Sequence, residues 1–148
     1  MNKKEILTHC FLQVQGRIAE IEKGIQDADQ ALAEDTKSSA GDKYETSREM
    51  LQQDLNRYQQ QLAIAQQDRG ILEKIDADKL LSAAGVGALI QTETATYFIA
   101  ISIGMVRLDQ ETIYVISPQS PIGKALLTKK VGEGFSFNGK HSVITAIA

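Results

Sequence analysis

The sequence predicts an α+β protein in which an N-terminal antiparallel helical coiled-coil hairpin precedes a small antiparallel β domain with one short helix. Two observations predict this class. Apolar residues recur at heptad spacing through the first half of the chain, and short β-rich runs separated by turn residues fill the second half. The pattern changes near Ile75, so we expect residues 1–75 to form the hairpin and residues 76–148 to form the β domain.

The first heptad seam lies between residues 7 and 32. Its positions follow one another at alternating spacings of four and three residues: Leu7, Phe11, Val14, Ile18, Ile21, Ile25, Ala28 and Leu32. An unbroken seam of this kind is typical of a helix that supercoils against a partner helix. We therefore predict one long helix in this part of the chain.

A second seam with the same alternation lies between residues 44 and 72. It contains arginines near both ends and consists of Tyr44, Arg48, Leu51, Leu55, Tyr58, Leu62, Ala65, Arg69 and Leu72. Two such segments joined by a short polar stretch fold back most easily as an antiparallel hairpin. We expect the turn of this hairpin between Asp35 and Gly41.

The second half of the chain contains the β-rich runs "VGALIQTE", "TYFIAISI", "TIYVIS" and "GFSFNGKHSVITAI". The last run includes Asn138-Gly139, which is the strongest two-residue signal for a β-hairpin turn. Between the last two runs, Pro121 is suited to the start of a helix, and Ile122, Ala125 and Leu126 share one face of it. These features predict a compact, mostly antiparallel sheet with one short helix.

Composition excludes several functional classes. The formal net charge of −3 argues against a protein that coats nucleic acid by bulk electrostatics, and the longest apolar runs are too short to cross a bilayer. Cys10 is the single cysteine, and no signal peptide precedes it, so we expect a cytoplasmic protein without membrane contact. His9 and His141 lie in different halves and cannot complete a zinc site with one cysteine, so we expect no catalytic centre and no stably bound metal.

The stretch "TKSSAGDKYETSRE" interrupts the two helical segments and carries acidic residues. Asp42 and Glu45 are three residues apart, so on a helix they share a face and both could approach one cation. Carboxylate oxygens are suitable ligands for Mg²⁺. An alternative reading is that Ser38 or Ser39 caps the second helix and that the acids favour its first turn by interacting with the helix dipole.

Two stretches resemble the Gre family of bacterial transcription elongation (transcript cleavage) factors. "SPQSPIGKALLTKKVGE", from Ser117 to Glu133, is similar to the family's Ser-Pro-Ile-x-x-Ala-Leu-(Ile/Leu)-x-Lys-x-x-Gly-Asp. The matching residues are Ser120, Pro121, Ile122, Ala125, Leu126, Lys129 and Gly132. Thr128 departs from the usual Gly, and Glu133 replaces Asp. "GDKYE", from Gly41 to Glu45, is similar to the family's shorter tip motif Gly-Asp-x-x-Glu.

The resemblance implies an FKBP-like C-terminal domain that docks at the mouth of the RNA polymerase secondary channel. Ser120, Pro121, Ile122 and Lys124 would then be polymerase-docking residues. The hairpin would enter the channel, and Asp42 and Glu45 would help to hold a second Mg²⁺ that belongs to the polymerase active site. The factor would not itself be an enzyme, because the polymerase would cleave the transcript. The implied partners are RNA polymerase and the backtracked RNA 3′ end, with contacts to DNA of the elongation complex left open.

The stretch between the two helical segments, residues 36–49, which we call the tip, can also be aligned with the family motif in a second way. If Tyr44, Arg48 and Glu49 correspond to the family's Tyr and Arg-Glu, the sequence shifts by one helical turn, and the acidic positions hold Lys37 and Ala40. The alternatives are therefore a Gre-like channel-binding regulator without cleavage activity, or a coiled-coil adaptor.

A prolyl isomerase is a further alternative, because the FKBP-like fold suggests that activity. It would require an aromatic-lined pocket. We expect three of the domain's five aromatic residues to serve the core; the five are Tyr97, Phe98, Tyr114, Phe135 and Phe137.

Overall fold

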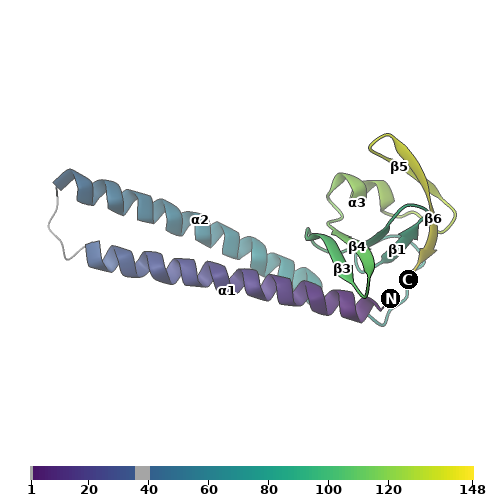
Figure 1. Ribbon diagram of the computed structural model, residues 1–148, viewed down its shortest axis with the longest axis horizontal. Coiled ribbons are helices and arrows are strands. Elements are labelled where there is room, and N and C mark those ends of the chain that lie inside the picture. Colours follow the sequence, from purple (N-terminus) through teal and green to yellow (C-terminus); the bar gives the residue numbers. More distant parts are fainter. Residues whose placement is uncertain (1, 36–40) are drawn as a thin grey trace. The chain divides into compact units, whose positions relative to one another are not determined.

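The computed structural model describes the backbone of residues 2–35 and 41–148, and the side chains of these residues except 35 and 41–44. Within this part of the chain, two long helices are followed by four strands, a short helix and two further strands (Figure 1). This order confirms the predicted α+β class. The chain divides into two compact units, one made of residues 11–69 and the other of residues 1–10 and 70–148.

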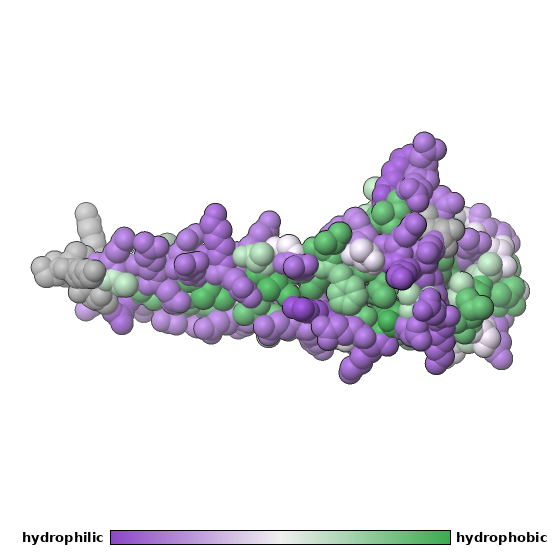
Figure 2. All heavy atoms as spheres, turned by 90° about the horizontal axis from the view of Figure 1, so that it is seen from below, coloured by the Kyte–Doolittle hydropathy of each residue, from purple (hydrophilic) through white to green (hydrophobic). Residues whose placement is uncertain are grey.

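The first of these units contains most of α1 (Lys3–Asp35) and of α2 (Gly41–Glu73), which lie side by side (Figure 1). Buried apolar residues follow the predicted seams: Val14, Ile21 and Ala28 in α1, and Leu55 and Ala65 in α2. Figure 2 shows hydrophobic atoms in a line along the helices between rows of hydrophilic atoms. Heptad spacing predicts this pattern, because it keeps one stripe of each helix facing the other.

Cross-helix neighbours give the direction of the two helices. Arg17 Nη2 lies 2.6 Å from Asp68 Oδ2, and the Tyr58 ring covers Gly24. Later residues of α1 therefore lie beside earlier residues of α2, so the helices are antiparallel, as predicted. The predicted turn itself, residues 36–40, lies outside the described residues.

The beginning of α1 belongs to the second unit, and its buried positions differ from the predicted seam. Lys3, Ile6 and Cys10 are buried, whereas Leu7 and Phe11 are only half-buried. The Lys3 ammonium donates hydrogen bonds to the carbonyl oxygens of Lys79 (2.8 Å) and Gly87 (3.0 Å). Residues 2–10 thus belong to the same unit as the β domain and do not follow the predicted heptad seam. The predicted domain boundary after residue 75 stays a prediction.

The six strands of the described chain form one sheet in the order β3-β4-β2-β1-β6-β5. Their bounds are β1 Leu89–Thr92, β2 Thr96–Ile99, β3 Gly104–Leu108, β4 Glu111–Ile116, β5 Gly134–Phe137 and β6 Lys140–Ile147. Four of the five pairings are antiparallel, but β2 pairs with β4 in parallel. The sheet is therefore mostly antiparallel, as predicted, and mixed because of this one parallel pairing, which the sequence did not indicate.

Two turns show where the strand predictions hold and where they fail. Asn138 and Gly139 have φ angles of 54° and 74° and join β5 to β6, as the Asn-Gly signal predicts. The strand β3 has no counterpart among the predicted runs. Its turn to β4 uses Asp109 and Gln110 with φ angles of 50° and 65°, and Gln is not a residue that signals such a turn.

The β domain has a core on the sheet face that carries α3 (Pro121–Leu126), and α3 packs against β5. The buried core residues come from several strands, from α3 and from the loop before β1: Ala84, Ala88, Ile90, Ile99, Ile116, Ile122, Leu126, Phe135 and Ile144. Among the residues described, no helix is both long enough and apolar enough to span a bilayer.

Candidate functional site

The stretch from Ser117 to Leu127 contains α3 and the residues that cap its N-terminus. Ser120 is the N-cap of α3: its Oγ accepts a hydrogen bond from Gly123 N at 3.1 Å and donates one to Ser117 O at 2.7 Å. Pro121 occupies the first helical turn, where its missing N–H costs nothing. The Ser-Pro-Ile motif therefore has a clear local structural role.

Gly123 is required by this turn, although sequence analysis assigned it no role. A Cβ atom on Gly123 would collide with the carbonyl oxygen of Ser117 and crowd Pro118. The backbone of the preceding turn thus lies directly against the helix. Only a residue without a side chain permits this approach.

The predicted docking residues divide into exposed and buried members. Pro121 and Lys124 are exposed, Ser120 is half-buried, and Ile122 is only 7% exposed because it packs into the domain core. Lys124 thus lies on the solvent side of α3, as its spacing from the apolar residues predicts. The docking role of all four residues stays a prediction.

Two motif positions after α3 have left-handed backbone conformations. Gly132, with φ of 89°, matches the family pattern, whereas Thr128, with φ of 68°, replaces the usual glycine. Backbone hydrogen bonds hold this segment, from Thr128 N to Ala84 O at 2.9 Å and from Ala84 N to Lys129 O at 2.8 Å. The sequence departure at Thr128 therefore coincides with a conformation that disfavours a β-branched residue.

The predicted tip acids lie at the beginning of α2. Both belong to the helix Gly41–Glu73, and Glu45 is exposed, while the side chain of Asp42 lies outside the described residues. Glu34, near the end of α1, is also exposed. The proposed caps Ser38 and Ser39, and the alternative positions Lys37 and Ala40, lie outside the described residues.

The described residues contain no group of three His, Cys, Asp or Glu side chains that could hold a metal ion. Cys10 is fully buried, and this desolvation raises the pKa of its thiol to about 11. The thiol is therefore protonated at neutral pH and is unsuited to act as a nucleophile.

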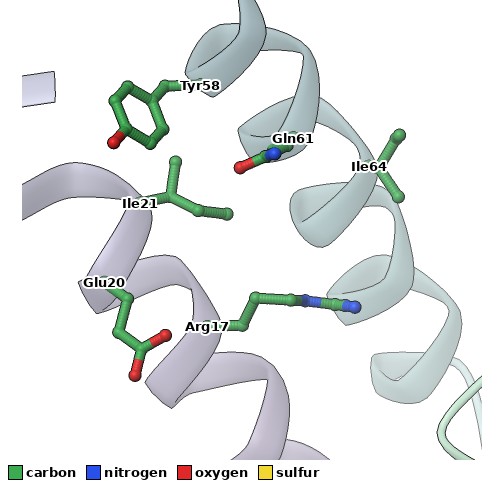
Figure 3. Close-up of a pocket in the computed structure, with 6 residues that line it drawn as sticks. All are labelled: Arg17, Glu20, Ile21, Tyr58, Gln61 and Ile64. Atoms are coloured by element: carbon green, nitrogen blue, oxygen red, sulfur yellow. The ribbon is translucent and has the colours of Figure 1, made fainter. Parts of the chain in front are cut away.

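A pocket of about 300 Å³ interrupts the helix seam; its lining residues are Arg17, Glu20, Ile21, Tyr58, Gln61 and Ile64. Figure 3 shows Arg17 reaching from α1 toward α2, where it forms its ion pair with Asp68. Within the described chain, the Arg17 Nε atom is buried without a hydrogen-bond partner. The pocket thus lies beside the Arg17–Asp68 ion pair.

A larger pocket of about 550 Å³ lies on the sheet face beside α3. Its walls include four of the domain's aromatic residues: Tyr97, Tyr114, Phe135 and Phe137. Phe98 and Phe135 are buried, and the half-buried Tyr97 and Phe137 pack against the core, so at least three of the five aromatic residues serve the core, as expected. Sequence analysis missed this pocket, because its tyrosines meet through the parallel pairing of β2 with β4.

No family model matches the sequence, and no curated protein matches it. Two solved structures are similar to the chain over nearly its whole length. One is described as the transcription factor Gfh1, with 19% identity, coverage of 93% of this chain and 92% of that chain, and a TM-score of 0.36. The other is described as GreA factor homolog 1 (Gfh1) of Thermus thermophilus, with 20% identity, coverage of 99% and 94%, and a TM-score of 0.36.

Proposed function

We propose that this protein is a cytoplasmic RNA polymerase accessory factor of the Gre type, which enters the secondary channel and stimulates cleavage of backtracked transcripts. The observation that carries the proposal is the Ser117–Glu133 stretch, whose motif residues form a self-capped helix with Pro121 and Lys124 exposed. The two helices, of 33 residues each, are long enough to enter the secondary channel toward the polymerase active site in this proposal.

The tip supplies carboxylates and no complete metal site. Mg²⁺ prefers octahedral coordination by oxygen, so Asp42 and Glu45 together would complete only part of its shell. In this proposal, RNA polymerase supplies the remaining ligands. The exposure of Glu45 is consistent with such a shared ion.

The cleavage chemistry would belong to the polymerase. A water oxygen bonds to phosphorus and the bond from phosphorus to O3′ breaks. The retained transcript keeps a 3′ hydroxyl, and the released fragment carries the 5′ phosphate. The contribution of the factor would be to help hold the Mg²⁺ that stabilises the developing charge.

A cleavage assay on a stalled, backtracked elongation complex tests this function. Wild-type protein should accelerate shortening of the transcript, whereas Asp42→Asn and Glu45→Gln should abolish stimulation but retain polymerase affinity. Higher Mg²⁺ should partly restore the variants, because mass action compensates for weaker metal binding. Glu34→Gln, at the end of the other helix, is the matched control and should behave as wild type.

A channel-binding regulator without cleavage activity is the second candidate. The alternative alignment of Tyr44, Arg48 and Glu49 favours it, since that alignment moves the acids away from the tip position. Binding to polymerase without stimulated cleavage at any Mg²⁺ concentration would identify this second function. Absence of polymerase binding would instead leave the adaptor hypothesis.

A further inference from the structure

One buried hydrogen-bond donor in the helix hairpin lacks a partner. Arg17 Nη2 forms its ion pair with Asp68 Oδ2 at 2.6 Å, but Arg17 Nε is buried and has no hydrogen-bond partner within the described residues. Leaving a buried N–H unpaired is unfavourable, so an acceptor that reaches it would relieve this cost. The Arg17 side chain as a whole is 41% exposed, so a small rotation can turn this N–H toward the neighbouring pocket.

The neighbouring pocket, which we call the hairpin pocket, is lined by residues of both helices (Figure 3): Arg17, Glu20, Ile21, Tyr58, Gln61 and Ile64. Ile21 is buried, the Tyr58 ring is half-buried and Ile64 is 58% exposed, so apolar surface is available to a ligand. A volume of about 300 Å³ lies at the lower end of the range for small-molecule sites. The hairpin pocket therefore fits a small molecule with an apolar part.

The polar side chains of the hairpin pocket offer donors as well as acceptors. The guanidinium of Arg17 supplies N–H donors only, whereas the exposed Glu20 supplies carboxylate oxygens, which are acceptors. The amide of Gln61, which is also exposed, can donate or accept. A ligand that carries an acceptor and a donor next to each other can therefore use both kinds of group.

The charges around the hairpin pocket disfavour an anionic ligand. Arg17 is paired with Asp68, and Arg57, which follows the same side of α2, is paired with Asp54 at 3.3 Å. Among these residues the Glu20 carboxylate remains as the charge without an opposite neighbour, and it would repel an anion. A cation would be attracted to Glu20 but would offer no acceptor to Arg17 Nε. The arrangement therefore favours a neutral ligand.

A primary carboxamide has the required combination of groups. Its carbonyl oxygen accepts hydrogen bonds, its NH2 group donates two, and it carries no net charge. A carboxylate has the acceptor but lacks the donor and is negative, and a ketone has the acceptor but lacks the donor. The hairpin pocket thus distinguishes the carboxamide from its closest isosteres.

We propose that the hairpin pocket binds a small, neutral primary carboxamide that is attached to an apolar group. The carbonyl oxygen of the ligand accepts a hydrogen bond from Arg17 Nε–H, and the NH2 group donates one to the Glu20 carboxylate. The apolar group lies against Ile21, Ile64 and the Tyr58 ring. This inference does not depend on the proposed action at RNA polymerase.

Nuclear magnetic resonance titration of the full chain with benzamide tests the proposal. Benzamide should shift the amide resonances of residues 17–21 and 58–64, with a dissociation constant on the order of a few mM or tighter. Acetophenone, which lacks the NH2 group, should bind about fivefold more weakly, because the Glu20 carboxylate then receives no hydrogen bond. Benzoate should bind about tenfold more weakly or not at all, because it adds a negative charge beside Glu20.

Two protein variants separate the polar contact from the apolar one. Arg17→Lys keeps a positive charge beside Asp68 but removes the Nε–H donor, so it should weaken benzamide binding about fivefold. Arg107→Lys is the matched control, since Arg107 is exposed on β3 and lies outside the pocket lining. Ile64→Ala should also weaken binding, whereas Leu12→Ala should not, because Leu12 is similarly exposed (63%) but does not line the pocket.

The outcomes that contradict the proposal are distinct. Absence of benzamide binding would overturn it, and so would equal or tighter binding of benzoate, because the pocket would then not select a neutral amide. Unchanged affinity in Arg17→Lys would exclude the role of the Nε–H donor. If that variant fails to fold, as judged by circular dichroism, Ile64→Ala still tests the site, because Ile64 is largely exposed and its replacement spares the buried seam.

Discussion

Lys3 Nζ donates a hydrogen bond to Gly87 O at 3.0 Å, although the two residues are 84 positions apart in the sequence. The same ammonium bonds to Lys79 O, and Lys3 is only 5% exposed. Burial lowers the pKa of Lys3, whereas the nearby charge of Asp76 acts in the opposite direction. The ammonium thus joins the first turn of α1 to the segment that enters β1.

We expect Lys3→Met to lower the free energy of unfolding by about 1.5–3 kcal/mol, because it removes charged hydrogen bonds and leaves two carbonyl groups without this donor. Urea denaturation measures the change. Lys4→Met is the matched control: Lys4 is exposed and its loss should change stability by about 0.5 kcal/mol or less. Equal effects of the two substitutions would contradict a structural role for the Lys3 ammonium.

Two glycines of α1 should respond in opposite directions to alanine. A Cβ on Gly24 would lie 2.6 Å from the Tyr58 ring, whereas a Cβ on Gly16 would meet nothing within 4 Å. Gly24→Ala should therefore destabilise the hairpin by about 1–3 kcal/mol through overpacking. Gly16→Ala should stabilise it by about 0.5–1 kcal/mol, because alanine favours a helix interior. Thermal unfolding followed by circular dichroism distinguishes the two; a gain from both would show that Tyr58 moves freely.

Thr128 adopts a conformation that favours glycine, with φ of 68°. A residue other than glycine in this region costs roughly 1–2 kcal/mol, and replacement by glycine removes this cost. Part of the gain is lost, because glycine has greater conformational freedom in the unfolded chain. We expect Thr128→Gly to raise the free energy of unfolding by about 0.5–1 kcal/mol. Thr128→Ala, which keeps a Cβ, should give a smaller change. A destabilised glycine variant would show that the threonine side chain makes a compensating contact.

The buried thiol of Cys10 should make stability depend on alkaline pH. Its folded-state pKa is raised from 9.0 to about 11, so the fold favours the protonated thiol. The associated stability is fully present below pH 9.0 and is lost as the pH rises toward about 11. The pKa of Tyr97 is also raised, mainly by burial and secondarily by Tyr114, and acts in the same direction. Urea denaturation of wild type and of Cys10→Ala at several alkaline pH values therefore isolates the contribution of the thiol. If the free energy of unfolding falls equally steeply with pH in both proteins, the thiol makes no such contribution.

Lys124 provides a test of docking that is separate from folding. Its side chain is exposed on α3, so Lys124→Glu should lower the melting temperature by no more than a few degrees. If α3 contacts RNA polymerase, the charge reversal should weaken binding to core polymerase measured by biolayer interferometry. Lys130→Glu is the matched control, since Lys130 is exposed but lies beyond α3. Unchanged affinity would leave packing of the domain as the role of the Ser-Pro-Ile stretch.

The sequence by itself determined the features that depend on local periodicity. Heptad spacing predicted the buried stripe through Val14, Ile21 and Leu55, because residues three and four apart in a helix necessarily share a face. The Asn138-Gly139 pair predicted its hairpin, because both residues tolerate positive φ. Pro121 predicted the start of α3, because its fixed φ angle suits the first turn of a helix whatever the rest of the fold.

The tertiary structure alone decided which distant segments meet. Alternation along a strand shows which residues share a face, but not which strands pair. The parallel pairing of β2 with β4, which brings Tyr97 beside Tyr114, could therefore not be predicted from the sequence. The burial of Lys3 has the same origin: its acceptors are carbonyl groups brought to it by the chain after residue 70. A backbone carbonyl is common to every residue type, so no sequence pattern marks it as the partner of a buried ammonium.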